Sequence, residues 1–220
     1  MSKYHKIQTI FKRGVDGNQQ ALRLGDWTKQ EFRILQSLQW HWTEKIDGMN
    51  IRVIYADRKI RFAGRTNHAN LPGQLVNHLN ELFIGKESII GEIFDGRNGV
   101  IYGEGYGGKI QKGSATYGPK QRFIAFDVMV DGVYWSEMAL CSVCGVLGID
   151  SAPLIDICSI DDMIEKCRNG IKSKLGDFEA EGVVGRPPVE LLDSRGNRII
   201  TKMKCKDFRN AVDVDALSKV

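Results

Sequence analysis

Residues 39–63 contain three β-type runs, and one short polar segment separates the first run from the second. The first run covers residues 39–43, and the other two, residues 50–55 and 59–63, flank a short turn. Two such runs around a short turn predict a β-hairpin. The polar segment between the first two runs is Glu44-Lys45-Ile46-Asp47-Gly48-Met49-Asn50. We therefore expect a β-rich chain that presents this segment at the end of a strand.

Lys45 is a candidate nucleophile within this segment. An ordinary lysine has a pKa of about 10.4 and is protonated at neutral pH, so burial or neighbouring cations must activate it. Asp47 projects to the same side of an extended chain, and Gly48 permits close approach of the backbone to a ligand. The same residues also fit a surface Lys-Asp turn between strands. The segment alone leaves both interpretations open.

The rest of the chain alternates between helical and β-type patterns. Apolar spacing predicts helices over residues 72–83, 136–147 and 159–168, the last with a Ser159/Asp162 capping box and Gly170 as its stop. A Thr28/Glu31 capping box predicts a short helix before residue 39, and Trp40 and Trp42 are expected to be core or interface aromatics. Residues 88–94 are expected to form a buried strand, and residues 122–130 a strand that turns at Asp131-Gly132. These elements predict one α+β domain over residues 1–220, with antiparallel sheets and flanking helices.

Residues 95–120 are rich in glycine and basic side chains. Gly103-Glu104-Gly105-Tyr106-Gly107-Gly108-Lys109 looks like a dinucleotide-binding glycine loop, but no apolar helix follows it and no βαβ frame surrounds it. We expect a mobile loop that places Lys109, Lys112 and Lys120 near a phosphate path, or else a plain solvated loop.

The composition is that of an ordinary globular protein, with 42% hydrophobic and 26% charged residues and a net charge of +4. This charge permits a polyanionic partner without requiring one. The five cysteines are expected to be reduced, because the C-x-x-C at Cys141 and Cys144 has no matching pair or nearby histidine to complete a zinc site. No apolar stretch approaches the ~20 residues that cross a bilayer, so we expect a cytoplasmic protein without a membrane partner.

Three lysines alternate near the end of the chain, at Lys202, Lys204 and Lys206. Alternate residues of a strand share one face, where three ammonium groups would repel one another unless an anion such as a triphosphate lay between them. A charged strand edge that resists aggregation would show the same pattern.

Taken together, these segments resemble the motifs of the covalent nucleotidyltransferases, and most closely the ATP-dependent RNA ligases of the phage T4 RNA ligase 2 type. Residues 44–50 resemble the nucleotidyl-lysine motif K-x-D-G-x-N, and Asn50 favours RNA ligases because DNA ligases and capping enzymes usually have arginine there. The other matching segments are Gly64-Arg65-Thr66, Gly91-Glu92-Ile93-Phe94, Phe123-Ile124-Ala125-Phe126-Asp127-Val128, Glu181-Gly182-Val183-Val184 and Thr201-Lys202-Met203-Lys204.

The resemblance implies a role for each candidate residue. Lys45 would form a lysyl-AMP from ATP, and Lys202 and Lys204 would hold the α-phosphate. Glu181 would be the carboxylate beside Mg²⁺ or Mn²⁺. The remaining nucleotide contacts would come from Glu44 and Asp47, from Asn50 and Arg65 at the ribose or a nucleic-acid phosphate, from Glu92 at a ribose hydroxyl and from Phe126 at the adenine. Lys204 and Lys206 fit the last motif as an alternative pair.

The implied reaction joins a 5′-phosphate end of nucleic acid, preferably RNA, to a 3′-hydroxyl. Ligases of this type usually continue into a C-terminal OB domain, whereas only residues 207–220 follow the last motif here. We expect no OB domain, and a partner protein or a homodimer in its place. The alternatives are a minimal DNA ligase, a capping-type guanylyltransferase and a nucleic-acid-binding module without turnover.

Overall fold

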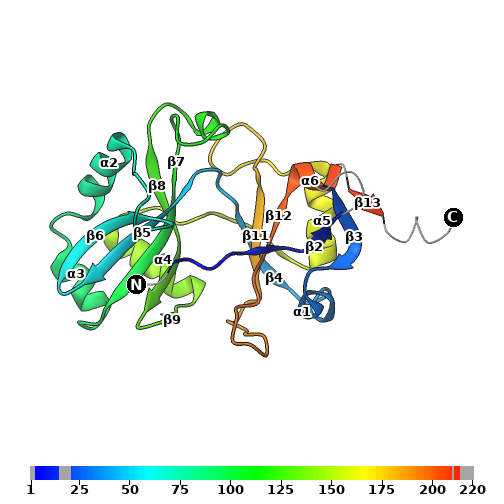
Figure 1. The fold of residues 1–220 in the computed structure, drawn as a ribbon, viewed down its shortest axis with the longest axis horizontal. Helices are drawn as coiled ribbons and strands as arrows, with labels where there is room; N and C mark the ends of the chain where they lie inside the picture. The colour runs from blue at the N-terminus through cyan, green and yellow to red at the C-terminus, as the bar shows by residue number, and fades with distance from the viewer. Residues whose placement is uncertain (1–2, 15–20, 210, 214–220) are drawn as a thin grey trace. The chain divides into compact units, whose positions relative to one another are not determined.

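The computed structural model describes residues 3–14, 21–209 and 211–213. The chain forms two compact units (Figure 1). Unit 1 comprises Met1–His5 and Ile46–Ala152, and unit 2 comprises Lys6–Lys45 and Pro153–Val220. The chain therefore leaves unit 2 directly after Lys45. The assignment of residues 1–220 to one domain stays a prediction.

Unit 1 is built on an antiparallel five-stranded sheet with the order β6-β5-β7-β8-β9. Its strands are β5 (Met49–Ala56), β6 (Lys59–Gly64), β7 (Gly99–Tyr106), β8 (Arg122–Val130) and β9 (Val133–Tyr134). Both predicted hairpins are confirmed, because Asp57 and Arg58 join β5 to β6 and Asp131 and Gly132 join β8 to β9 with positive φ angles. Positive φ at both central residues is what the type I′ turn of a two-residue hairpin requires.

Three helices cover one face of this sheet: α2 (Gly73–Phe83), α3 (Glu87–Ile93) and α4 (Glu137–Leu147) (Figure 1). Their buried side chains, such as Leu75, Ile90 and Val143, form one core with Ile51 and Ile101 of the sheet. Residues that alternate with these, including Asn50 on β5 and Glu104 on β7, project from the opposite face. That second face therefore carries polar side chains from the neighbouring strands β5 and β7, and we call it the polar face of unit 1.

Two predictions in unit 1 are wrong. The expected strand over residues 88–94 is the helix α3, whose Ile90 and neighbouring Phe94 enter the core at helical spacing. The expected loop over residues 95–120 contains β7, an inner strand of the sheet. Residues 95–98 and 107–121 lie outside the strand, and the second of these segments includes the short 3₁₀ helix η1 (Ser114–Tyr117).

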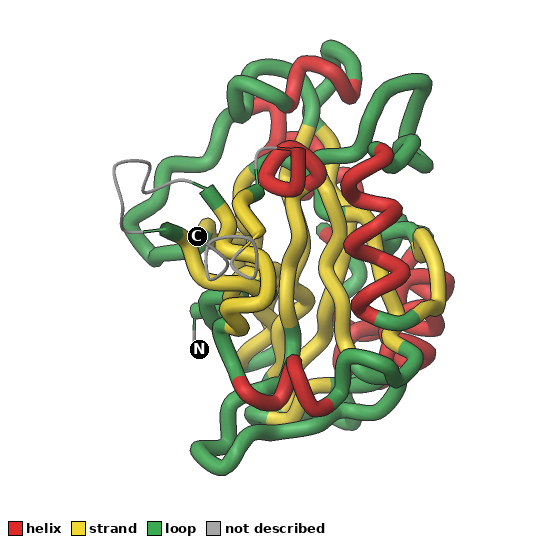
Figure 2. The backbone as a smooth tube through the Cα atoms, turned by 90° about the vertical axis from the view of Figure 1, so that its right-hand side faces the viewer, coloured by secondary structure: helices red, strands yellow, loops and turns green. Residues whose placement is uncertain are grey.

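Unit 2 contains a five-stranded sheet with the order β1-β12-β11-β4-β10 and a three-stranded sheet with the order β13-β3-β2 (strands in yellow, Figure 2). The larger sheet consists of β1 (Gln8–Thr9), β4 (Trp40–Glu44), β10 (Leu154–Cys158), β11 (Gly182–Arg186) and β12 (Thr201–Lys204). The smaller sheet consists of β2 (Phe11–Arg13), β3 (Leu22–Trp27) and β13 (Val212–Asp213). Trp40 and Trp42 are both fully buried with their rings stacked at 5.8 Å, which confirms them as core residues.

The helices of unit 2 are α1 (Gln30–Ile34), α5 (Ile160–Asn169) and α6 (Cys205–Arg209). The start of α5 is as predicted, because Ser159 accepts a hydrogen bond from the backbone N–H of Asp162 at 3.1 Å. The predicted Thr28/Glu31 capping box is wrong: α1 has Lys29 as its N-cap and no side-chain cap. The described part of the chain contains no helix long and apolar enough to cross a membrane, and all five cysteines are free thiols.

Candidate active site

Three neighbouring strands of unit 2 bring the candidate lysines together. Lys45 directly follows β4, and its backbone N–H donates to the carbonyl of Gly182 on β11 at 2.9 Å. In turn, β11 pairs with β12 so that Gly182 lies opposite Lys204 and Val184 opposite Lys202. Lys202 and Lys204 alternate along β12 with the buried Thr201 and Met203, so both project away from the core.

Glu181 connects Lys45 to Lys204. One carboxylate oxygen accepts from the Lys45 ammonium, and the other forms an ion pair of 2.7 Å with Lys204. The three side chains are between 15% and 27% exposed, so this chain of charges is largely shielded from solvent. Lys45 and Glu181 are 136 residues apart in the sequence, and the pairing of β4 with β11 brings them into contact.

Two groups of this cluster, Glu181 and Lys202, have pKa values below their ordinary ones. Burial alone would raise the pKa of Glu181, but the charges and hydrogen bonds of Lys45 and Lys204 outweigh it, so this pKa lies below its ordinary value. Burial lowers the pKa of Lys202, and the positive charges of Lys45 and Lys204 lower it further, against the opposing effect of Glu181. The site thus holds one carboxylate among three lysines and disfavours the protonated form of Lys202.

The structure also distinguishes the two alternative lysine pairs. Lys202 and Lys204 lie on β12, whereas Lys206 is exposed on the helix α6. The prediction that all three lysines share one strand is therefore wrong. The chain changes from strand to helix at Cys205, whose backbone N–H donates to the carbonyl of Glu181 at 3.0 Å.

The side chain of Glu44 is buried and already occupied. Its two carboxylate oxygens accept hydrogen bonds from the Ser173 hydroxyl at 2.6 Å and from the backbone N–H of Lys174 at 2.7 Å. Glu44 therefore anchors residues 173–174 to the end of β4, directly before Lys45. Its predicted contact with a nucleotide stays untested, and this geometry supports a positioning role.

Asn50 and Glu104 form the centre of the polar face in unit 1. They lie directly opposite each other on β5 and β7, and directly paired residues share a face. The Asn50 side-chain oxygen is buried without a hydrogen-bond partner among the described residues. A buried acceptor without a donor is costly, so this oxygen is suited to a donor supplied by a ligand.

Sequence reasoning missed Glu104 because Gly103 and Gly105 flank it. These glycines are packing residues of a strand: a Cβ at Gly103 would lie 2.3 Å from the Phe123 ring, and one at Gly105 would lie 2.5 Å from Leu75. The apolar run Val100-Ile101-Tyr102 before them was the available signal for a buried strand.

Phe126 lies at an irregularity of β8. Tyr102 on β7 pairs with Asp127 and Gly103 pairs with Ala125, which leaves Phe126 as the additional residue of a β-bulge. Its half-buried ring contacts Tyr4 edge-on, with the ring centroids 5.0 Å apart. The Tyr4 hydroxyl donates to the buried carboxylate of Asp127 at 2.8 Å. The bulge thus displays one aromatic ring on the same sheet face as Asn50 and Glu104.

Asp47 and Arg65 also belong to unit 1. The Asp47 backbone N–H donates to the Tyr117 hydroxyl at 3.1 Å, and its carbonyl accepts from the Ser114 hydroxyl at 2.6 Å. Arg65 is exposed in the turn after β6. The buried Arg52 supports that turn by donating to the Gly64 carbonyl at 2.8 Å and to the Asn67 side chain at 2.7 Å.

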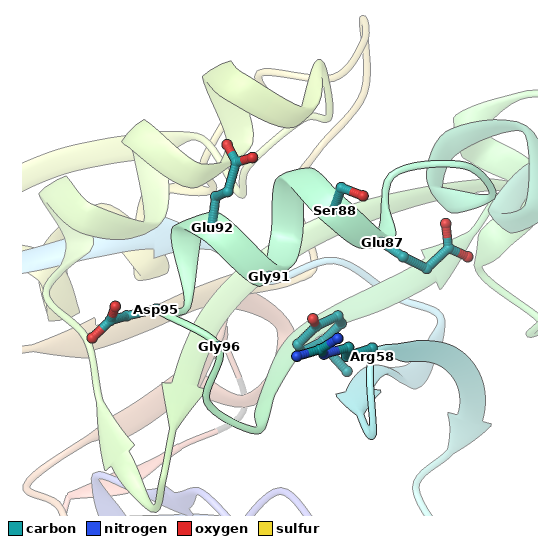
Figure 3. Close-up of a pocket in the computed structure, with 8 residues that line it drawn as sticks. Arg58, Glu87, Ser88, Gly91, Glu92, Asp95 and Gly96 are labelled. Atoms are coloured by element: carbon teal, nitrogen blue, oxygen red, sulfur yellow. The ribbon is translucent and has the colours of Figure 1, made fainter.

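Glu92 lies apart from this polar face. It is exposed on α3, in an open cavity of about 590 Å³ that Arg58, Glu87 and Asp95 also line. Figure 3 shows its carboxylate pointing away from Arg58. Glu92 remains untested as a ribose contact, but Glu104 has the strand position that the sequence analysis assigned to Glu92.

A divalent metal fits this chain only if a ligand supplies most of the donors. Within residues 3–14, 21–209 and 211–213, no group of three or more His, Cys, Asp or Glu side chains could hold a metal ion. Glu181 offers carboxylate oxygens beside the lysines, and Mg²⁺ commonly binds through one or two carboxylates together with substrate phosphates and water. The residues present fit that arrangement.

Comparison with known proteins identifies the family. The structure is similar to RNA ligase structures from Naegleria gruberi: an arginine-to-alanine mutant with ATP and Mn (TM-score 0.64, 16% identity, 100% of this chain and 58% of that one), a lysine-to-methionine mutant with AMP and Mn (0.60, 16%, 100% and 61%) and a form with PPi (0.60, 17%, 98% and 63%). The chain thus spans about three fifths of the length of these ligases, and at this identity the likeness shows the fold. No curated protein matches the chain. The family model described as RNA ligase matches residues 38–204, so the chain belongs to the RNA ligase family.

Proposed function

We propose that this chain is the nucleotidyl-transfer part of an ATP-dependent RNA ligase, with Lys45 as the nucleophile. The observation that carries the proposal is the chain of charges Lys45-Glu181-Lys204 with Lys202 beside it. A lone surface Lys-Asp turn would not need two further lysines and a shared carboxylate. The family match and the ligase fold support the same reaction.

In the first step, the Lys45 amine attacks the α-phosphorus of ATP. A nitrogen–phosphorus bond forms, the bond to the leaving pyrophosphate breaks, and the amine loses its proton. Lys202 and Lys204 stabilise the negative charge that develops on the α-phosphate, because fixed cations in a shielded site act most strongly where charge appears. Glu181 positions Lys45 and Lys204 for this step.

The next two steps move the AMP and seal the strand. An oxygen of the 5′-phosphate at an RNA end attacks the phosphorus of lysyl-AMP, which breaks the nitrogen–phosphorus bond and frees Lys45. The oxygen of a 3′-hydroxyl then attacks the 5′-phosphorus, and AMP leaves. A bound Mg²⁺ or Mn²⁺ beside Glu181 would neutralise phosphate charge.

The polar face of unit 1 supplies the nucleotide contacts in this proposal. Phe126 stacks on adenine, and its display on a bulge suits that role. Asn50 accepts a hydrogen bond from a hydroxyl group, as its unpartnered oxygen requires, and Glu104 takes the role of ribose acceptor that the sequence analysis gave to Glu92. Arg65 contacts a phosphate of the nucleic acid, and Asp47 contributes mainly through its backbone.

Transfer of label from α-labelled ATP to the protein tests the first step. Wild type should become labelled in the presence of Mg²⁺ or Mn²⁺, and Lys45→Ala should not. Lys206→Ala is the matched control, since it removes an exposed lysine of the same unit and should be labelled like wild type. Retained labelling of Lys45→Ala would reject this nucleophile.

Sealing assays with different nucleic-acid substrates test the remaining steps. Offered 5′-phosphorylated nicks in RNA and in DNA, the labelled protein should seal RNA more efficiently. Labelling from α-labelled GTP in place of ATP would indicate a guanylyltransferase, and preferential sealing of DNA would indicate a DNA ligase.

A further inference from the structure

A second cationic feature lies in unit 1, outside the lysine cluster. We define the basic loop as residues 107–121, together with Arg122 at the start of β8. Between Glu104 and Asp127 the sequence has no acidic residue but four cationic ones, Lys109, Lys112, Lys120 and Arg122. This short segment therefore carries a formal charge equal to the net +4 of the entire chain.

The four cations are exposed and form no ion pairs among the residues that the structure describes. Within the described ranges, none of them forms an ion pair with an acidic side chain. By contrast, many exposed cations of unit 2 have acidic partners, as in the pairs Lys12–Asp26 and Lys172–Asp177. Four unpaired cations gathered on one loop give it a positive potential that attracts an anionic ligand.

The basic loop has a defined shape. The Gly108 N–H donates to the Gly118 carbonyl at 2.8 Å, which brings the two ends of the loop together. Both glycines have positive φ angles, of 56° and 100°, which other residues adopt only with strain. Tyr117 packs edge-on against Tyr106 at the end of β7, with the ring centroids 5.3 Å apart. The lysines are thus carried by a compact scaffold.

The loop is also attached directly to the nucleotidyl-lysine motif. Ser114, which is fully buried, donates to the Asp47 carbonyl, and the Tyr117 hydroxyl accepts from the Asp47 N–H. A Cβ at Gly113 would lie 2.1 Å from an Asp47 carboxylate oxygen, so the Asp47 side chain also lies against this part of the loop. Asp47 is two residues after Lys45 in the chain. The position of the loop is therefore tied to the motif that carries the nucleophile.

We propose that the basic loop binds the phosphate backbone of the RNA whose ends are joined, and this inference rests on the proposed function. Lysines act as point charges toward phosphate, and backbone contacts position a nucleic acid without reading its sequence. The one aromatic residue of the loop, Tyr117, is occupied by Tyr106 and Asp47, which leaves no ring for base stacking. The binding should therefore depend on salt and little on base sequence.

Lys109 and Lys112 are the main contacts in this proposal. Lys120 and Arg122 line a cavity of about 360 Å³ together with Glu81 and Asp150, whose carboxylates oppose their charge. Both Lys109 and Lys112 are exposed, and Lys112 directly precedes Gly113, which lies against Asp47. A variant without these two lysines is thus the sharpest probe.

The test compares Lys109→Ala/Lys112→Ala with wild type in binding to a nicked RNA duplex, over a series of salt concentrations. Each lost phosphate contact should reduce the slope of log affinity against log salt by about 0.9. The double variant should lose roughly 1.8 from the slope, which corresponds to about 60-fold weaker binding at 0.1 M salt. Lysyl-AMP formation from ATP should stay at the wild-type level, because the loop does not hold ATP in this proposal.

Lys59→Ala/Arg61→Ala is the matched control, since it removes two exposed cations from the edge strand β6 of the same sheet. Its salt slope should equal that of wild type. An unchanged slope in the loop variant, or equal losses in both variants, would overturn the proposal. Loss of lysyl-AMP formation with RNA binding intact would also overturn it, by assigning the loop to ATP. If wild-type protein forms no lysyl-AMP but shows the expected salt slopes, the proposed function fails and the RNA surface stands.

Discussion

The polar faces of the two units handle charge in opposite ways. In unit 2, Glu181 already pairs with Lys45 and Lys204, so the cluster is held in place by its own charges. In unit 1, the Asn50 oxygen has no donor among the described residues and the basic loop has no acids. The first arrangement is preorganised for chemistry, and the second leaves partners for a ligand to supply. Substitutions in unit 2 should therefore affect bond making, and those in unit 1 should affect binding.

The largest expected effect comes from Glu181→Gln. The amide keeps the size of the side chain but removes the charge that holds Lys45 and Lys204 in place. Misplacement of a reacting group by about 1 Å can cost on the order of 100-fold in rate, so lysyl-AMP formation should slow by about that factor. A single-turnover assay with labelled ATP measures the rate.

The control for this change is Glu179→Gln, two residues earlier in the chain. Glu179 forms an exposed ion pair with Arg209, and exposed pairs contribute little to stability. Its rate should match wild type. Equal slowing of both variants would show that unit 2 has lost its fold, and an unaffected Glu181→Gln would remove the basis for the charge-held cluster.

Gly103→Ala should have the next largest effect, on stability. The added Cβ would lie 2.3 Å from the Phe123 ring and 2.4 Å from the Ile124 carbonyl, so β7 and β8 must shift. Overpacking of this kind costs about 1–3 kcal/mol, which denaturant unfolding measures. Gly145→Ala within α4 has open space around its Cβ and should instead stabilise the protein by up to about 1 kcal/mol. The opposite order would contradict the description of β7 as a packed inner strand.

An effect of similar size, on ATP binding, is expected at Glu104 in the polar face of unit 1. Loss of a hydrogen bond to a charged acceptor costs about 1.5–3 kcal/mol, so Glu104→Gln should raise the KM for ATP by at least about tenfold. The rate at saturating ATP should change less. Glu92→Gln, on the exposed face of α3, should leave both parameters unchanged. A raised KM in Glu92→Gln alone would restore the original assignment.

The fold was predictable where a local rule operates without competition. The Asp131-Gly132 turn and the Ser159 cap each depend on neighbouring residues, and both occur as predicted. The prediction of a strand over residues 88–94 was wrong because a short apolar run fits a buried strand and a buried helix equally well. The strand around Gly103 and Gly105 was not predicted, because these glycines make room for the Phe123 ring and for Leu75. Both of these side chains come from other elements, so the local sequence does not show the need for glycine.

The candidate site shows the same division. Lys45, Lys202 and Lys204 were found by motif and spacing, and the sheet brings the three strand ends together. The sequence did not predict the contacts of the two carboxylates. Glu181 pairs with two lysines, whereas Glu44 binds Ser173. These contacts depend on the register of β4 against β11. The docking of Ser114 onto Asp47 was likewise absent from any motif.

The smallest expected effect concerns Lys202, and it tests whether the cluster in unit 2 is strained by its cations. Because folding lowers the pKa of Lys202, the folded protein binds this proton less tightly than the unfolded chain. The charge therefore destabilises the fold at neutral pH, and the cost is relieved as pH rises through the lowered pKa towards the ordinary value of 10.5.

Lys202→Met removes the charge and keeps most of the side-chain volume. It should be more stable than wild type at neutral pH by no more than about 1 kcal/mol, since Lys202 is only partly buried. The gain in stability should be accompanied by slower lysyl-AMP formation, which is the usual conflict between stability and activity at a charged site. Urea unfolding from neutral to alkaline pH measures the difference, which should shrink as pH rises. Lys206→Met, which removes an exposed lysine on α6, is the control and should match the stability of wild type at neutral pH. A Lys202→Met variant less stable than wild type at neutral pH would mean that Glu181 balances all three lysines.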